Sequence, residues 1–386
     1  MRSMIGAFFG LMSWVAGLVL SVIEPLATGD GTLSLLVRGF AIRRRNAARL
    51  KLFAQALHSG AMQGKTILVT GSARGLGSGI AAHLAASGAR LILPHRNGAS
   101  AAALQVELAR TGTAVVREAD PKASTLEASA INVVSPLCGL ELGSFTSIER
   151  LVDALEAEGV LLDALINNAG MVPIAPGVTS EGFEKAFGVN FLGTAHLTLL
   201  LVQRGLLKPD ATIVNVSSEE HRLASLATHT GVPPPPSARR WHATGAAQTV
   251  ALGAVPSKAS MLNAMDRYAY SKLLLTTFSH ELARRFPLAV RDICPGPVAS
   301  EIARDAPWPI CDLVQAGMWA IFPSPADAAL PVIELLRLPR ASDKAPVHYH
   351  MCEAKPAGSR AEEAAIGAWL WEQTQGLIAA RCPPES

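Results

Sequence analysis

The chain has 386 residues, of which 49% are hydrophobic, enough for one large domain or two ordinary ones, so disorder throughout the chain is excluded. Thirty-four basic and 31 acidic residues leave a net charge of +3, which is too close to balance for a protein whose whole surface binds nucleic acid. The cysteines form no C-x-x-C pair, so the sequence predicts no metal site and favours a reducing compartment; they are Cys138, Cys294, Cys311, Cys352 and Cys382.

Residues 4–23 read MIGAFFGLMSWVAGLVLSVI and carry no charge. Twenty apolar residues suit a single helix across a bilayer, and we expect a transmembrane anchor here. A cleaved signal peptide, or a hairpin inserted into a membrane or lipid droplet, is the alternative. Basic residues follow the run, and the positive-inside rule then places the rest of the chain in the cytosol; these residues are Arg38, Arg43, Arg44, Arg45, Arg49 and Lys51.

Residues 24–61 are predicted to be a basic juxtamembrane linker. Within them, residues 33–57 mix leucines with arginines, as an interfacial helix on the membrane surface does. An ordinary basic linker explains the same composition, and both interpretations remain open at this point.

Beyond residue 62, short apolar runs alternate with segments of helical periodicity, beginning TILVTG, SGIAAHLAASGA, RLILPH and ALQVELART. This alternation is typical of βαβ units, so we predict an α/β fold with a doubly wound parallel sheet, a Rossmann fold, and helices on both faces. A single domain over 62–386 is expected. Two stretches rich in loop-forming residues, near 117–137 and 219–264, are interpreted as insertions.

The first strand-like run leads into GSARGLGSG, which places Gly71, Gly75 and Gly77 directly before a helical segment. Glycines at such a turn let the backbone approach a phosphate, and the helix N-terminus offers free N–H groups. The pattern therefore predicts a dinucleotide-binding loop.

The next strand ends in LPHRN, at the place where an NAD-selective site usually has an acidic residue for the ribose hydroxyls. Arg96 stands there instead, and Arg74 lies in the glycine loop. Guanidinium groups suit a 2′-phosphate, so the sequence predicts NADP, with NAD as the less favoured alternative.

Six motifs in one order resemble the short-chain dehydrogenase/reductase family over about residues 62–378. They are TGSARGLG (70–77), NNAG (167–170), FGVN (187–190), IVNVSS (213–218), YAYSK (268–272) and PGPVAS (295–300). The segments TSEGFEKAFGVNFLGTAHLT, SSEEH, SPADAA and WLWEQT are similar to its membrane-anchored, retinol-dehydrogenase-like branch.

The resemblance implies catalytic roles for Asn190, Ser218, Tyr268 and Lys272: a relay water beside Asn190, a polarised substrate oxygen at Ser218, and a cofactor ribose held by Lys272. It also implies a cofactor-binding set: Gly71, Ser72, Arg74, Gly75, Leu76, Gly77, Arg96, Asn97, Glu141, Asn167, Asn168, Ala169, Gly170, Tyr268, Lys272, Pro295, Gly296, Val298 and Ser300. Glu141 is favoured as the carboxylate near the adenine, with Asp120 as the alternative.

The residues themselves distinguish the two neighbouring tyrosines. A carbonyl that accepts hydride needs a proton donor, and a tyrosine can serve when a nearby cation lowers its pKa from about 10. Tyr268 and Lys272 are four residues apart and share a helix face, whereas Tyr270 lies about 200° around the helix from the lysine. We therefore expect Tyr268 to be the acid and Tyr270 to pack. His221, after Ser218, is expected to be structural or substrate-facing.

These observations predict an NADP-dependent oxidoreductase that interconverts an alcohol and a carbonyl on a lipophilic substrate such as a retinoid, steroid, polyprenoid or fatty aldehyde. The alternative is an NADP-binding membrane scaffold or sensor, with the insertion at 219–264 contacting proteins. The expected location is a single-pass membrane protein of the endoplasmic reticulum with its catalytic domain in the cytosol. A homodimer is a candidate assembly, and no nucleic-acid partner is expected.

Overall fold

The computed structural model describes residues 32–96, 133–134, 139–173, 175, 177–222, 224, 261–299, 322–338 and 347–381. The predicted anchor over 4–23, most of both insertions, and Asp120, Asn97 and Ser300 lie outside these residues. Among the helices within them, none combines the length and the apolar character that crossing a bilayer requires.

A mostly parallel sheet forms the centre of the described part of the chain. Its spatial order is β3 (Val133–Val134), β2 (Arg90–Ile92), β1 (Thr66–Val69), β4 (Leu162–Asn167), β5 (Leu207–Val216), β6 (Ala289–Cys294), β7 (His348–His350) and β8 (Glu353–Ala354). Only β8 pairs antiparallel, against β7. The predicted doubly wound parallel sheet is confirmed.

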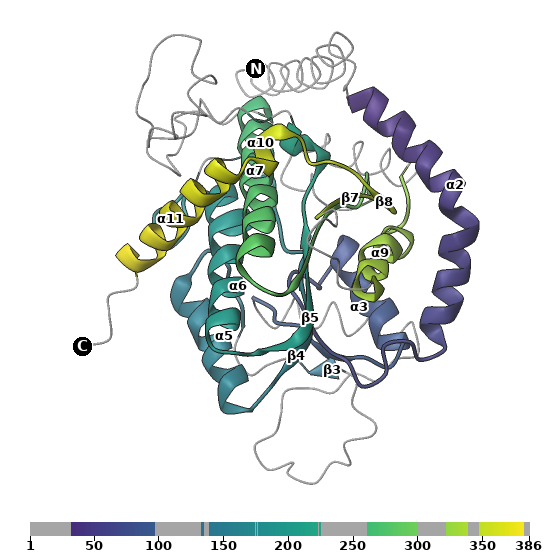
Figure 1. Cartoon of the computed structure of the whole chain (residues 1–386), viewed down its shortest axis with the longest axis horizontal. Coiled ribbons are helices and arrows are strands. Elements are labelled where there is room, and N and C mark those ends of the chain that lie inside the picture. The colour runs from purple at the N-terminus through teal and green to yellow at the C-terminus, as the bar shows by residue number, and fades with distance from the viewer. Residues whose placement is uncertain are drawn as a thin grey trace, which may run out of the picture.

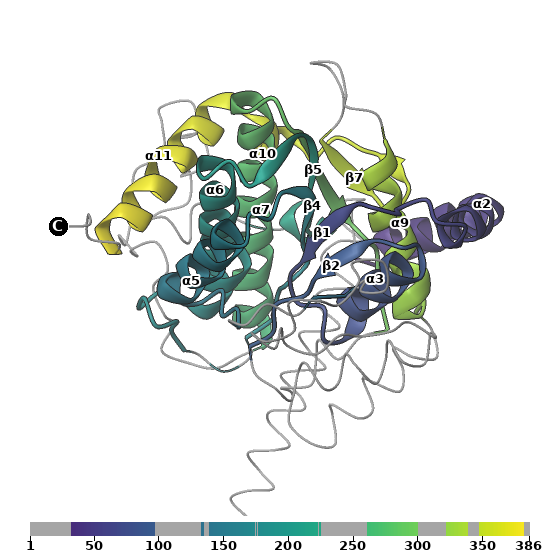
Figure 2. The same cartoon turned by 90° about the horizontal axis from the view of Figure 1, so that it is seen from below.

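Helices cover both faces of the sheet, as Figures 1 and 2 show. One face carries α5 (Phe145–Ala157), α6 (Thr194–Gln203), α7 (Met261–Arg285) and, outside them, α11 (Ala364–Arg381). The other carries α3 (Gly75–Ala86), α9 (Pro325–Glu334) and α2 (Thr32–His58). Short elements complete the path: η2 (Phe187–Gly193), η3 (Glu219–Arg222), η6 (Leu335–Arg337) and α10 (Ser359–Glu362).

Two apolar cores lie on the two sides of the sheet, as expected for strands buried on both faces. The strands β1 and β6 are buried along their whole length. N-cap hydrogen bonds mark the start of two flanking helices. The Ser144 hydroxyl accepts the Ser147 N–H at the start of α5, and the Ser324 hydroxyl accepts the Asp327 N–H at the start of α9.

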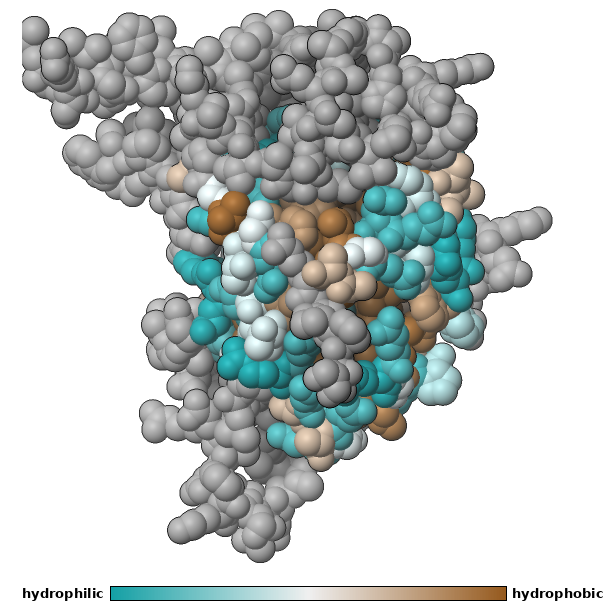
Figure 3. Space-filling model, turned by 90° about the vertical axis from the view of Figure 1, so that its left-hand side faces the viewer, coloured by the Kyte–Doolittle hydropathy of each residue, from teal (hydrophilic) through white to brown (hydrophobic). Residues whose placement is uncertain are grey.

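The face of the molecule that carries α5 and α11 has a mixed character (Figure 3). Hydrophilic residues are interleaved there with hydrophobic ones over the described part of that face. Trp369, Leu377 and Ile378 of α11 are only partly buried against the core.

Residues 32–58, assigned to the linker by the sequence, form one long helix. Leu50, Phe53 and Leu57 of its second half are buried in the core beside α3 and α9. Ion pairs join Arg49 to Glu334 and Arg45 to Glu353. The second half of α2 is therefore part of the folded domain, because its apolar positions recur at helical spacing toward the sheet.

The strand order reverses between β1 and β4. In open α/β sheets, ligands bind beyond the carboxyl ends of the strands at such a reversal. The glycine loop follows β1 and the NNAG motif follows β4, so the fold brings both motifs to this position.

Candidate active site

A cavity of about 580 Å³ lies at the carboxyl ends of the strands. Its volume is in the range of sites for small molecules and cofactors. Most of the described residues in the predicted set line it: Gly71, Arg74, Gly75, Leu76, Gly77, Arg96, Glu141, Asn168, Ala169, Gly170, Ser218, Tyr268, Lys272, Pro295, Gly296 and Val298.

The glycine loop is packed too tightly for a side chain at Gly71 or Gly77. A Cβ at Gly77 would lie 2.2 Å from the Gly71 carbonyl oxygen, and a Cβ at Gly71 would lie 2.7 Å from the Ala169 Cα. Gly71 also has φ of +67°, which favours glycine. The loop is thus a close-packed cradle at the start of α3.

The N-terminus of α3 faces this cradle, and its N-cap residue Arg74 makes no side-chain capping hydrogen bond. Free N–H groups and the helix dipole at such an end suit a pyrophosphate. The glycine cradle, the helix N-terminus and the adjoining cavity therefore fit a nicotinamide dinucleotide.

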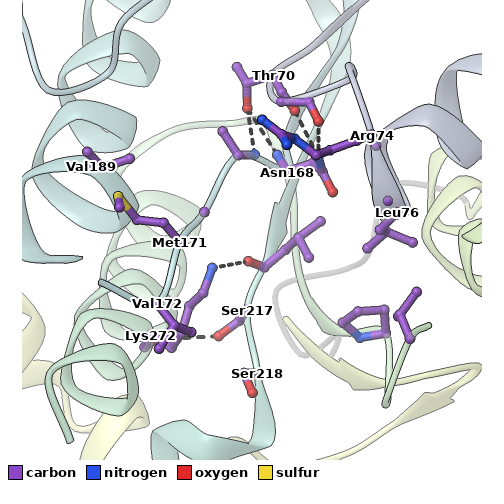
Figure 4. A pocket seen from close by; sticks show the side chains of 18 of the residues that line it. Thr70, Arg74, Leu76, Asn168, Met171, Val172, Val189, Ser217, Ser218 and Lys272 are labelled. Carbon is purple, nitrogen blue, oxygen red and sulfur yellow. Dashed lines mark hydrogen bonds between the residues drawn. The ribbon is translucent and has the colours of Figure 1, made fainter. Parts of the chain in front are cut away.

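Asn168 holds the loop in place rather than only lining the cavity. Its side-chain nitrogen donates to the carbonyl oxygens of Thr70, at 3.0 Å, and Gly71, at 3.1 Å. In return, the Thr70 hydroxyl accepts the backbone N–H groups of Asn168 and Ala169. These bonds lock the loop after β1 to the loop after β4, near Arg74 in Figure 4.

Two charged residues meet at the end of β2. Arg96 Nη1 lies 3.6 Å from Glu141 Oε2, and their side chains are 56% and 43% exposed. Both were predicted to contact the adenine end of the cofactor, so the fold brings these two together although 45 residues separate them in the sequence.

The helix α7 presents Tyr268 and Lys272 to the cavity. The Lys272 ammonium lies 5.7 Å from the centre of the Tyr268 ring and donates to the Val216 carbonyl oxygen at 2.8 Å. Lys272 is seen below the glycine loop in Figure 4. Tyr270, by contrast, is 3% exposed and belongs to the apolar core behind the helix. The helix geometry thus separates the two tyrosines as expected.

The pKa values of this pair differ from the expectation. Burial raises the pKa of Tyr268 above its usual value, and a hydrogen bond with Ser218 only partly opposes that effect. Burial also lowers the pKa of Lys272 to about 8. The net shift of the Tyr268 pKa is therefore upward rather than downward, because low polarity around both groups disfavours charge on either one. The phenol stays protonated at neutral pH.

Ser218 follows the end of β5 and begins a short turn. Its hydroxyl accepts the Glu220 backbone N–H at 3.2 Å and contacts the Tyr268 hydroxyl. Its carbonyl oxygen lies 2.6 Å from His221 Nδ1. His221 is 1% exposed and its other nitrogen lies 2.8 Å from the Ala357 carbonyl oxygen, so this histidine is structural.

Asn190 is fully buried and lies beside the cavity, outside its described lining. It sits on the π-helical segment η2, a distortion often found near functional sites. Its side-chain nitrogen donates to the Met171 carbonyl, at 2.9 Å, and the Ser271 hydroxyl, at 3.0 Å. The Ser271 hydroxyl in turn donates to the Tyr268 carbonyl. Asn190 thus joins the loop after β4 to the helix that carries Tyr268.

Two further predicted residues do not line the cavity. Ser72 is fully buried, and its hydroxyl has no hydrogen-bond partner among the described residues. Asn167 is 2% exposed and donates to Thr198, at 2.9 Å, and Asn215, at 2.8 Å. The assignment of Asn167 to cofactor binding is corrected to a structural bridge between strands and α6, because neighbouring strand residues point to opposite faces.

The apolar wall of the cavity was not predicted. Met171, Val172 and Val189 lie together on one side in Figure 4, and Met265 and Phe322 also line the cavity. No motif marks these positions, since apolar residues of this kind also build the core. Glu220 is an acidic residue that also lines the cavity, and burial together with the neighbouring Glu219 raises its pKa.

Comparison with known proteins agrees with this geometry. The profile of the short chain dehydrogenase family matches residues 65–135 and 108–228. Human retinol dehydrogenase 14 is 29% identical over 360 residues, covering 92% of this chain and 96% of that protein. The short chain dehydrogenase resG of Aspergillus sclerotiorum is 32% identical over 240 residues, covering 59% of each chain.

The fold is also similar to that of a solved structure, a putative uncharacterized protein from Mycobacterium paratuberculosis. The TM-score is 0.52 at 24% identity, covering 84% of this chain and 96% of that one. The chain belongs to the short-chain dehydrogenase/reductase family, and its relatives confirm the retinol-dehydrogenase-like branch. It is accordingly an oxidoreductase of a family that binds NAD or NADP.

Proposed function

We propose that this protein is an NADP-dependent oxidoreductase that interconverts an alcohol and a carbonyl on a lipophilic substrate. The observation that carries the proposal is the meeting of Tyr268, Ser218 and Lys272 in one cavity with the glycine loop. A proton donor beside a dinucleotide cradle is what carbonyl reduction needs.

NADPH, when bound, supplies the hydride. The glycine loop and the N-terminus of α3 would hold its pyrophosphate, and Lys272 its ribose. Tyr268 donates its phenolic proton to the carbonyl oxygen on which negative charge develops, and the Ser218 hydroxyl orients that oxygen. Because the raised pKa keeps Tyr268 protonated, the resting site is ready for reduction.

The preference for NADP is supported by Arg96 and Arg74, which both line the cavity. Arg96 follows the second strand, where an arginine accommodates a 2′-phosphate. Its exposed pairing with Glu141 is weak enough for a phosphate to compete.

A lipophilic substrate is supported by the apolar wall formed by Met171, Val172, Val189, Met265 and Phe322. Retinoids, steroids, polyprenoids and fatty aldehydes fit this description. The uncharged run at 4–23, with the basic residues after it, supports a single-pass anchor in the endoplasmic reticulum, so that the catalytic domain would meet such substrates at the membrane from the cytosol.

The test uses the full chain purified in detergent. NADPH oxidation is followed at 340 nm with retinal, a steroid ketone, a polyprenal and a long-chain aldehyde, and NADPH binding is measured separately by fluorescence. We expect turnover of at least one of these carbonyls, abolished in Tyr268→Phe. Binding of NADPH without oxidation by any of them would contradict the proposal and favour an NADP-binding scaffold.

A further inference from the structure

The turn that carries Ser218 is held by polar contacts on the side away from the cavity. Ser217, Ser218 and Glu220 line the cavity, whereas the Glu219 side chain between them points into the protein. Glu219 is 4% exposed, so its carboxylate depends on protein partners for its stability.

Side chains of potential positive charge surround the Glu219 carboxylate, and three of them make its closest contacts. His348 Nε2 lies 3.0 Å from Oε1, Arg222 Nε donates to Oε2 at 2.8 Å, and Lys355 Nζ also contacts Oε2. Burial alone would raise the pKa of Glu219, but these partners hold it well below its usual range. The residue is therefore an ionised anchor at the first position of η3.

The contacts continue from His348 into the sheet and return to the same turn. His348 Nδ1 lies 2.5 Å from Asp292 Oδ2, which also accepts the Thr276 hydroxyl at 3.1 Å. The Thr276 hydroxyl lies 2.7 Å from the Ser217 hydroxyl. Ser217 and Glu219 flank Ser218, so the backbone closes a ring.

We call this ring the Ser218 clasp and define it by Ser217, Thr276, Asp292, His348 and Glu219. Its members come from the end of β5, from α7, from β6, from β7 and from η3. Each is 5% exposed or less, so water competes little for these hydrogen bonds.

The segment after β8 reinforces the clasp. His221 Nε2 lies 2.8 Å from the Ala357 carbonyl oxygen, and Arg222 donates to the Pro356 carbonyl oxygen. The turn is thus fixed on both sides of Ser218. Ser217 contacts Thr276, and the residues after Ser218 contact residues more than 120 positions away in the sequence.

We propose that Glu219, acting through the clasp, is a positioning residue for the Ser218 hydroxyl. The proposal rests on the proposed function, in which Ser218 orients the substrate oxygen. A displacement of about 1 Å in such a group lowers the rate up to about 100-fold. A looser turn should therefore lower kcat clearly while the free energy of unfolding changes little.

The test compares Glu219→Gln with Asp163→Asn in the full chain. Asp163 is a matched control: its buried carboxylate accepts Lys65, at 3.0 Å, and Lys208, at 2.7 Å, at the opposite ends of the strands. Lys355→Met is a milder variant of the clasp, because that side chain is 30% exposed. NADPH turnover, KM for the carbonyl, NADPH affinity, Tm and hydrogen exchange of residues 217–222 are measured.

We expect Glu219→Gln to lower kcat about tenfold or more, with NADPH affinity within about threefold of wild type and faster exchange in residues 217–222. Lys355→Met should show a smaller loss of the same kind. Asp163→Asn should lower Tm without either effect. If wild type turns over and Glu219→Gln keeps its kcat, or if kcat falls equally in Asp163→Asn, the positioning role is wrong. If wild type does not turn over, but hydrogen exchange in residues 217–222 is faster in Glu219→Gln than in wild type and Asp163→Asn, the proposed function is contradicted and the clasp is not.

Discussion

Arg96 and Glu141 face each other at the adenine end of the cavity, with 3.6 Å between Nη1 and Oε2. Both side chains are about half exposed, and an exposed ion pair of this kind contributes at most about 1 kcal/mol. A doubly charged phosphate offers Arg96 a stronger partner than one carboxylate. The pair is therefore compatible with selection for a 2′-phosphate.

Arg96→Glu should weaken the use of NADPH by about tenfold or more in kcat/KM, while kcat/KM for NADH stays constant or rises. Steady-state kinetics with both cofactors measures this. Arg90→Glu makes the same change of net charge at the exposed amino end of β2 and should change kcat/KM for neither NADPH nor NADH. An equal loss with NADH and NADPH in Arg96→Glu would be evidence against a phosphate contact.

The two neighbouring tyrosines of α7 give a second prediction. Tyr268→Phe should lower kcat by about 10²- to 10⁴-fold, the usual contribution of a general acid, with little change in NADPH affinity. Tyr270→Phe should keep kcat within about twofold, because Tyr270 packs in the core. Comparable losses in both variants would indicate that the helix as a whole, rather than one phenol, was disturbed.

Much of this site follows from the sequence because its parts are local. Tyr268 and Lys272 share one helix, and Gly71, Gly75 and Gly77 share one loop, so spacing alone predicts their geometry. The strand order follows from the rules for βαβ units, which leave few topologies for an alternating pattern.

Other features depend on tertiary contacts and leave no pattern in the sequence. His348 and Asp292 pair across β6 and β7, and Glu219 contacts His348 from 129 residues away. The expected lowering of the Tyr268 pKa is wrong for the same reason, because burial raises that pKa and burial depends on everything packed around the helix. The packed half of α2 was missed because its arginines dominate the composition.

The lowered pKa of Lys272 predicts an alkaline limit to the reaction. Lys272 is cationic below about pH 8 and loses its proton above that value, whereas Tyr268 keeps its proton because burial raises its pKa. The kcat of carbonyl reduction should therefore fall above about pH 8. Lys272→Arg keeps the charge at high pH, so its activity, though lower, should not show that limb. A limb near pH 8 that persists in Lys272→Arg would assign it to another group.

His348 should make folding stability depend on pH. Burial by itself lowers its pKa, but the hydrogen bonds to Asp292 and Glu219 raise it to about 9. A group whose folded pKa exceeds its unfolded value of about 6.5 stabilises fully below pH 6.5, and this is lost as pH rises through 9. Wild type should thus lose stability from this group, on the order of 1 kcal/mol, between pH 6.5 and 8.

Chemical unfolding of wild type and His348→Gln at both pH values measures the effect, and the variant should show a flatter dependence. The other ionisable groups around His348 are common to both proteins; they are Asp292, Glu219, Arg222, Lys355, His221, His280 and His350. Staying below pH 8 avoids Lys272, whose lowered pKa acts with the opposite sign. Parallel curves for the two proteins would show that His348 does not change its charge in this window.

The glycine loop allows a comparison between backbone strain and steric contact. Gly71 and Gly205 have nearly the same φ, +67° and +66°, so alanine at either position costs about 1 kcal/mol in backbone strain. A Cβ at Gly71 would also lie 2.7 Å from the Ala169 Cα, whereas nothing lies within 4 Å of a Cβ at Gly205. Gly71→Ala should therefore weaken NADPH binding at least about tenfold by displacing Ala169, and Gly205→Ala should lower Tm slightly with unchanged binding. Isothermal titration with NADPH separates the two, and tight binding by Gly71→Ala would mean that the loop adapts without losing the cradle.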